Sequence, residues 1–138
     1  MEPLVLSDAS RTLAGILLVS FVTIETGGAY LVKISTGREE VTEFQRGFAR
    51  AGHAHAGVLV LLALVCQLYV DGTDQSGLIG WLSRSGVAAA AILMPAGFFF
   101  SSTGKGRSQP NRFIVLVFAG AVLLGAGVLS LGIGLLIS

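Results

Sequence analysis

Four long apolar segments, separated by short polar connections, constrain this chain more than any other feature of its sequence. A helix crosses the hydrocarbon core of a bilayer with roughly 20 residues, at about 1.5 Å per residue. The first, second and fourth segments reach about this length, and the third is shorter. We therefore predict an all-α integral membrane bundle, a single domain over residues 1–138. Its four transmembrane helices are expected at residues 13–32, 52–70, 86–100 and 113–137.

The third segment needs a separate argument because of its length. Residues 78–82 just before it are also apolar, and Pro95 lies within it. Proline has no amide hydrogen, so one helix carbonyl loses its bond and neighbouring helices must cover it. We expect this segment to span the membrane with a kink at Pro95. A re-entrant segment is the alternative.

The composition agrees with a membrane location and excludes several classes of protein. Charged residues make up 12% of the chain, against roughly a quarter in a soluble domain. The net charge of +1 gives no reason to expect a nucleic-acid partner. The single cysteine, Cys66, excludes an intrachain disulfide and is expected to pack as a small apolar side chain. Acidic residues precede the first basic one, unlike a cleaved secretory signal, so we expect the first segment to be retained.

Basic residues predict the orientation of the bundle. The first and third connections, which share one side of the membrane, hold Lys33, Arg38, Arg46, Arg50, Lys105, Arg107 and Arg112. The opposite side holds Arg11 and Arg84. Connections rich in Lys and Arg remain in the cytoplasm, so both chain termini are expected outside.

Glycine repeats at helical spacing in the fourth segment. Gly120, Gly127 and Gly134 are seven residues apart, as are Gly125 and Gly132. Small residues at this spacing allow helix backbones to approach closely within a membrane. The repeat predicts close packing of the fourth helix inside the chain, or alternatively a seam between copies in a homo-oligomer.

The candidate site combines one carboxylate, Glu25, with two histidines, His53 and His55. An ionisable residue within a membrane span is costly and normally faces a protein interior or a wet cavity. Glu25 lies seven residues before the end of the first predicted span, about 10 Å deep, and His55 lies about 4–5 Å into the second. Since both positions are near the same side of the membrane, the carboxylate and a histidine are expected to meet.

The two histidines are not expected to share one partner. Residues two apart on a helix point about 200° apart, so one histidine would face Glu25 while the other faces elsewhere. A buried carboxylate beside an imidazole forms a proton relay or a cation site. Nearby hydroxyls belong to Thr23, Thr26 and Tyr30. We expect proton-coupled transport or ion conduction through this site. A purely structural contact between two helices is an alternative.

Cofactor binding is a further alternative. Glu25, His53 and His55 are possible zinc ligands, although the opposed histidines argue against one shared ion. A bis-histidine haem would need one histidine from each of two copies, because no histidine lies outside the second span. No catalytic triad, phosphate-binding loop, dinucleotide motif or di-iron pattern is visible, so the sequence does not favour an enzyme.

The start of the second span carries Arg46 and Arg50 at helical spacing, with Phe44 and Phe48 beside them. This pattern predicts that the helix continues into the headgroup region. There the two arginines would bind anionic lipid phosphates, or alternatively an anionic substrate.

The run FARAGHAHAGVLVLLALVCQLYV, residues 48–70, resembles the histidine-bearing helix of small four-helix relatives of cytochrome oxidase subunit I. The resemblance implies that His53 or His55 is a haem ligand. The second axial histidine and the copper-site histidines of the full oxidase subunit are missing here, which excludes terminal oxidase chemistry for this chain alone. The whole chain is similar to small four-helix membrane proteins of high-GC bacteria. A bacterial cytoplasmic membrane is therefore the expected location.

The expected partners follow from this membrane setting. They are the lipid bilayer, further copies of the chain in a homo-oligomer, and another membrane protein for which the chain would be a non-catalytic subunit.

Overall fold

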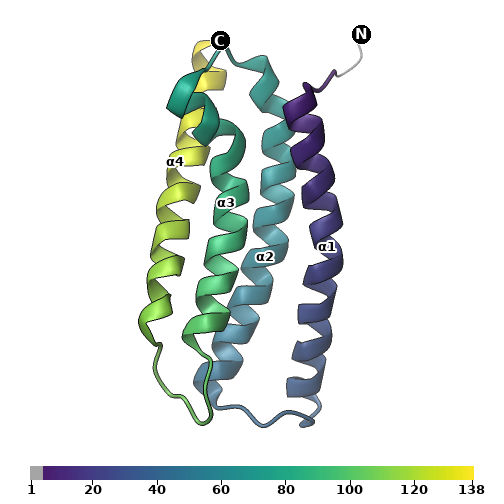
Figure 1. Ribbon diagram of the computed structural model, residues 1–138, viewed down its shortest axis with the longest axis vertical. Helices are drawn as coiled ribbons and strands as arrows, with labels where there is room; N and C mark the ends of the chain where they lie inside the picture. The colour runs from purple at the N-terminus through teal and green to yellow at the C-terminus, as the bar shows by residue number, and fades with distance from the viewer. Residues whose placement is uncertain (1–4) are drawn as a thin grey trace.

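The computed structural model describes residues 5–138, which form four long helices (Figure 1). These are α1 (Asp8–Ser35), α2 (Glu43–Tyr69), α3 (Gly77–Ser101) and α4 (Val115–Ile137). Two short 3-10 helices, η1 (Val70–Gly72) and η2 (Arg112–Ile114), follow α2 and precede α4. The described residues contain no strand, and the predicted all-α bundle is confirmed.

Each long helix, counted with its adjoining 3-10 turn, is long and apolar enough to cross a membrane. α2 begins at residue 43, nine residues before the expected span, as the helical spacing of Arg46 and Arg50 predicts. α3 begins at residue 77, nine residues before its expected span. α3 continues through Pro95 as one helix of 25 residues. The third segment is therefore a full-length helix.

Capping residues explain where α1 and α2 begin. Thr42 caps α2 through a reciprocal pair of bonds, in which its hydroxyl accepts from the Gln45 amide and the Gln45 side chain accepts from the Thr42 amide. Ser7 caps α1 by accepting from the Ser10 amide at 3.2 Å. Such side chains satisfy amide groups that have no partner in the first turn.

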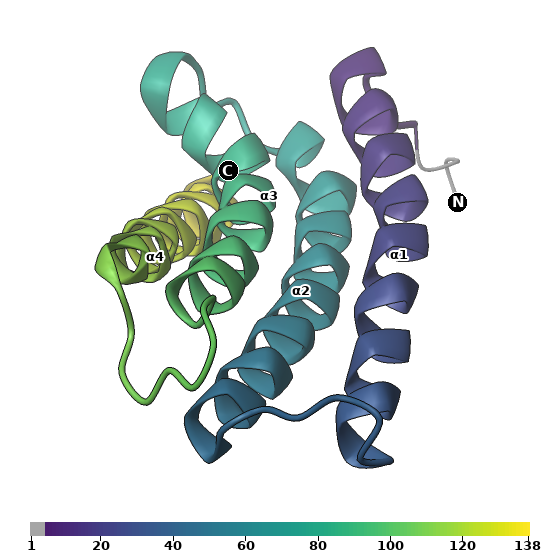
Figure 2. The same ribbon diagram turned by 60° about the horizontal axis from the view of Figure 1, so that its bottom comes forward.

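The helices run alternately up and down and pack mainly against their neighbours in the sequence (Figures 1 and 2). α1 packs on α2, α2 on α3, and α3 most extensively on α4. The ends of the described chain lie at one end of the molecule, and the α1–α2 and α3–α4 loops lie at the other. The result is an open arc of helices rather than a closed ring (Figure 2).

Glycines allow α4 to approach α3 closely. Gly120, Gly127 and Gly134 are buried on the face of α4 toward α3 and its preceding loop. A Cβ atom at Gly127 would lie 3.0 Å from the Leu82 carbonyl oxygen and 3.2 Å from the Gly86 Cα. This repeat therefore serves packing inside the chain. A Cβ atom added at Gly125 or at Gly132 would have no neighbouring atom within 4 Å.

A polar cluster joins three elements near the end of the molecule where the described chain begins and ends. Arg84 of α3 donates from Nη2 to Asp71 Oδ1 at 2.9 Å and from Nη1 to the hydroxyl of Ser10, which is fully buried. The amide and hydroxyl of Ser7 donate to the two Asp71 oxygens at 2.8 and 2.9 Å. These contacts tie the start of α1 and η1 to α3. We call Ser7, Ser10, Asp71 and Arg84 the terminal cluster.

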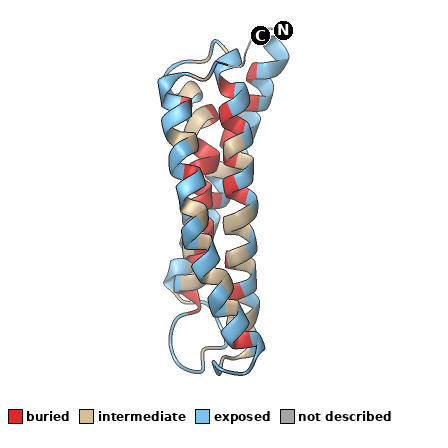
Figure 3. Ribbon diagram, turned by 90° about the vertical axis from the view of Figure 1, so that its right-hand side faces the viewer, coloured by how far each residue is buried: buried red, intermediate tan, exposed pale blue. Residues whose placement is uncertain are grey.

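Most of the outer surface of the helices is apolar. Figure 3 shows buried residues along the inner faces and exposed residues along the outer ones. Val22 on α1 and Val122 on α4 are 68% and 71% exposed. Cys66, in contrast, is buried in the core, as expected. Large exposed apolar surfaces on four spanning helices identify a multi-pass membrane protein.

Candidate functional site

His53 of α2 lies against two glycines of α1. A Cβ atom at Gly27 would be 3.3 Å from His53 Nδ1, and one at Gly28 would be 3.4 Å from His53 Cε1. The absence of side chains at these two positions therefore makes room for the imidazole. The His53 nitrogens make no hydrogen bond with the described residues, and the residue is only partly buried. His53 is thus an unpaired titratable group beside α1.

Glu25 lies close in level to His53 but points elsewhere. It is exposed, and within residues 5–138 no hydrogen bond or ion pair joins it to either histidine. It is two residues from Gly27, so the two positions point about 200° apart on the helix. Ten residues separate Glu25 from the end of α1 at Ser35, which places it about 15 Å from that end. The carboxylate is therefore on the uncovered side of α1.

His55 lies on a different side of α2, toward α3. Its Nδ1 is 2.7 Å from the Ala51 carbonyl oxygen, so this nitrogen carries the proton and donates. Its ring centroid is 5.0 Å from that of Phe98. The two histidines have separate surroundings, as their spacing indicates, and His53 is the one beside α1.

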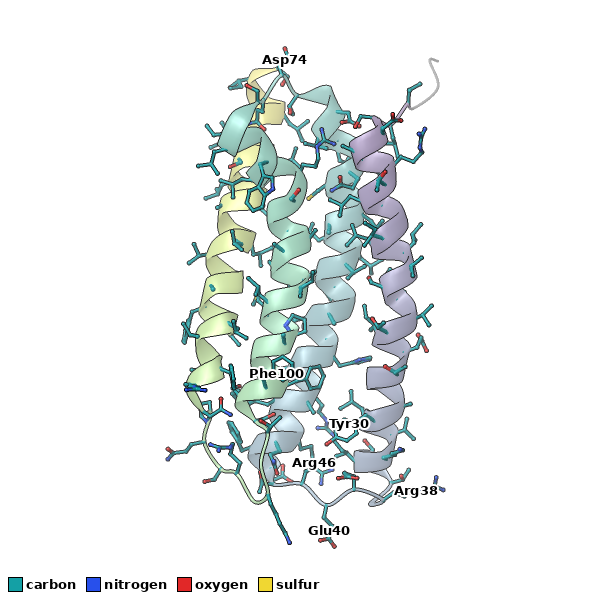
Figure 4. The ribbon with its side chains drawn as sticks, in the orientation of Figure 1. Tyr30, Arg38, Glu40, Arg46, Asp74 and Phe100 are labelled. Carbon is teal, nitrogen blue, oxygen red and sulfur yellow. The ribbon has the colours of Figure 1, made fainter. Side chains whose placement is uncertain are left out.

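The hydroxyls of α1 form a ladder along the helix. Ser20, Thr23 and Thr26 each donate to the carbonyl three residues earlier, at 2.6 Å. Their protons are therefore committed, and their oxygen lone pairs remain as acceptors. Tyr30 is 38% exposed and lies below this ladder, where α1 and α2 approach the loops (Figure 4).

The two arginines at the start of α2 differ in burial. Arg46 Nε lies 3.5 Å from Glu43 Oε1 but makes no hydrogen bond with the described residues. The Glu43 side chain is 92% exposed, so solvent weakens this ion pair. Arg50 is exposed. Their contact with lipid phosphates stays a prediction.

No metal centre is formed within the described part of the chain. There, no three residues among His, Cys, Asp and Glu come close enough to hold an ion. Glu25, His53 and His55 have three different surroundings, which does not fit a zinc site in one chain. Haem ligation by one histidine from each of two copies stays a prediction.

An apolar groove runs between α1 and α3, with α2 as its floor. Its volume is about 460 Å³. It is hollow because α3 presents small residues here, where a larger side chain would fill the space. The lining includes Leu17, Thr23, His53, Val60, Ala89 and Phe99. We call this the apolar groove. His53 is its one titratable group.

A second cavity lies at the end of the molecule formed by the two long loops. Its volume is about 620 Å³, and Phe99 lines both hollows. Its polar lining is formed by Tyr30, Glu39, Glu40, Gln45, Thr103 and Lys105. We call this the loop cavity. Figure 4 shows Glu40 at this end and Asp74 at the opposite one.

Side-chain bonds hold the two loops together around this cavity. Gln45 Nε2 donates to the carbonyls of Ser102 and Gly104 at 3.0 and 2.8 Å. Thr42 Oγ1 donates to the Arg107 carbonyl at 2.5 Å. Sequence reasoning missed the loop cavity, since Glu39, Glu40 and Lys105 read only as loop charges. The one available signal for the groove was the run of alanines at residues 88–91.

Comparisons with protein-family models, with curated proteins and with solved structures found no match. The functional argument therefore depends on the geometry of the chain itself.

Proposed function

We propose that this chain is a membrane protein that self-associates through α1 and takes up protons at Glu25 within the contact. The observation that carries the proposal is the exposure of Glu25 on a helix of membrane-spanning length, with no partner in the described residues. A charged carboxyl group at the centre of a spanning helix costs about 2.5–3.5 kcal/mol on insertion scales. Covering it with another chain, or protonating it, removes much of this cost.

α1 is the helix best suited to such a contact. It is the least buried of the four, and it packs mainly against α2. Its outer face carries small residues above and below Glu25, namely Gly15 and Ala29, both exposed. Small residues permit a second helix to approach closely. The outer face of α1 therefore suits helix association.

A second copy offers a chemically suitable partner. In a two-fold pair within one membrane, equivalent residues of the two α1 helices lie at the same depth. Thr26 donates its own proton to the Thr23 carbonyl, so its lone pairs can accept from a protonated Glu25 of the other copy. Two facing carboxylates do not ionise independently. The two copies would therefore share a proton between their Glu25 side chains.

Cysteine cross-linking in membranes tests the contact. In a Cys66→Ser background, Val22→Cys places a thiol on α1 beside Glu25, and Val122→Cys places an equally exposed thiol on α4 as the control. We expect Val22→Cys, and not Val122→Cys, to give cross-linked dimers. Dimers from the α4 position instead would refute the proposal. A cross-link to a different protein would favour the subunit alternative.

Two substitutions of Glu25 separate assembly from proton uptake. Glu25→Gln keeps an N–H donor, so we expect cross-linking to persist and to lose its dependence on pH. Glu25→Ala removes the donor and should weaken cross-linking at every pH. If Glu25→Gln left pH-dependent proton flux in proteoliposomes unchanged, proton movement through this residue would be refuted.

The proposal also covers the orientation of the chain in the membrane and a possible cofactor. We propose that the loops with excess Lys and Arg lie in the cytoplasm of a bacterial cell and that both termini lie outside. A haem bound between copies would give a Soret absorption band, and a spectrum of the purified protein tests this alternative.

A further inference from the structure

We propose that the apolar groove and the loop cavity together bind one phospholipid with a primary-amine headgroup. One acyl chain would lie in the apolar groove, and the headgroup would lie in the loop cavity. This site is separate from the α1 contact, because Glu25 is not among the residues that line either hollow. The two proposals can therefore fail independently.

The groove has the shape and polarity of a chain-binding site. Along α1 its lining runs from Leu13 to Gly27, which is about 21 Å at 1.5 Å per residue. Its walls are mostly aliphatic, with a few hydroxyls that already donate to the helix backbone. Binding pockets for small apolar ligands occupy about 300–1,000 Å³ and have this kind of lining.

The polarity changes at the level of His53 and Phe99. Phe99 lines both hollows, so the two adjoin at this side chain. The His53 imidazole, unpaired in the described residues, supplies one donor and one acceptor near this junction. The ester groups that join acyl chains to a headgroup are hydrogen-bond acceptors and would suit this level.

Charge complementarity selects the headgroup. Lys105 comes from the α3–α4 loop, and Glu39 and Glu40 come from the α1–α2 loop. None of the three forms an ion pair within the described residues. Lys105 suits a phosphate, and the carboxylates suit an ammonium group that donates hydrogen bonds.

Other common headgroups fit this cavity less well. An anionic glycerol headgroup would meet two carboxylates and one lysine. A choline headgroup has no N–H to donate to the carboxylates. A zwitterionic primary amine satisfies both signs of charge. Since Glu39, Glu40 and Lys105 are exposed, each contact is screened and modest.

Native mass spectrometry of the full-length protein in detergent tests this site. The probes are phosphatidylethanolamine, phosphatidylglycerol and phosphatidylcholine with identical acyl chains. Exposed charge pairs contribute about 0.2–1 kcal/mol each, so two such pairs predict a preference of about 2-fold to 30-fold for the ethanolamine lipid. Equal binding of the three lipids, or a preference for phosphatidylglycerol, would overturn the proposal.

Substitutions in the two hollows should have different effects. Glu39→Gln with Glu40→Gln should abolish the preference while leaving acyl-chain binding in place. Lys105→Gln removes the contact with the phosphate, which all three lipids share, so it should weaken binding of all three and keep the preference. Ala89→Leu fills the groove and should weaken binding of all three lipids. Ala121→Leu, on an exposed position of α4 outside the groove, is the matched control and should change nothing. Unchanged helical circular dichroism verifies folding for each variant, and a preference that survives the double glutamine variant refutes the headgroup assignment.

Discussion

At the scale of single residues, the Arg84 side chain contacts all three other members of the terminal cluster. Its guanidinium reaches the carboxylate of Asp71 and the hydroxyl of Ser10, and it also lies 3.4 Å from the Ser7 hydroxyl. The Arg84 and Asp71 side chains are 27% and 19% exposed. A planar guanidinium with several donors can bridge these groups, whereas a lysine ammonium cannot reproduce that geometry.

We therefore expect Arg84→Ala to lower the free energy of unfolding by about 1–2 kcal/mol, because it removes the donor to the buried Ser10 hydroxyl and the ion pair with Asp71. Arg84→Lys should lose part of this stability. Denaturant titration in detergent, followed by circular dichroism, measures both. Arg11→Ala, which removes an ion pair with 71% and 92% exposed side chains, is the control and should have no effect. Equal stability of the Arg84→Ala and wild-type proteins would contradict the role of the cluster.

The direction of Glu25 is the residue-scale feature that sequence reasoning could not supply. Counting along the helices places Glu25 and the histidines at similar levels, because rise per residue is constant. Rotation about the helix axis is different, since it depends on which face packs against the neighbour. Here Gly27 and Gly28 face His53, and this rotation of α1 places Glu25 on the exposed side of the helix. No hydropathy pattern contains this information.

At the scale of elements, two glycines of α4 test how closely this helix packs against α3. Gly127→Ala would bring a Cβ atom to 3.0 Å from the Leu82 carbonyl oxygen and 3.1 Å from the Val87 amide nitrogen. Both are backbone atoms, so the helices would have to separate. We expect a loss of about 1–3 kcal/mol in unfolding free energy. Gly125→Ala meets no atom within 4 Å and should be neutral or slightly stabilising. The same titration compares them, and equal effects would contradict close packing at Gly127.

Hydropathy also explains which parts of the helices were predictable. The apolar centre of each helix was found, because lipid exposure requires it. The extension of α2 toward residue 43 was indicated by the helical spacing of Arg46 and Arg50, whereas the first turns of α3, from residue 77, lay outside the expected span. The start of α2 is determined by local capping through Thr42 and Gln45, whereas Ser76 before α3 makes no side-chain capping bond. A search for capping residues upstream of the second apolar run would have placed the start of α2 at Thr42.

At the scale of the whole molecule, both ends of the described chain lie opposite the two long loops. Combined with the excess of Lys and Arg at the loop end, this predicts external termini. A C-terminal alkaline phosphatase fusion should be active in a bacterial host, and a C-terminal green fluorescent protein fusion should be dark. A thiol at Ser108→Cys, in the α3–α4 loop, should react only after the membrane is opened. The reverse pattern would invert the assigned orientation.

The open arc of helices has a consequence for how the protein is made. Since each helix packs mainly on the one before it, every new helix finds its principal neighbour already in the membrane during synthesis. The main exception is the contact between the start of α1 and α3 through the terminal cluster, which joins helices that are not neighbours in the sequence. Assembly can therefore follow the order of translation, with that link closing once α3 has been inserted. Low separation between contacting segments is the condition under which chains fold fast.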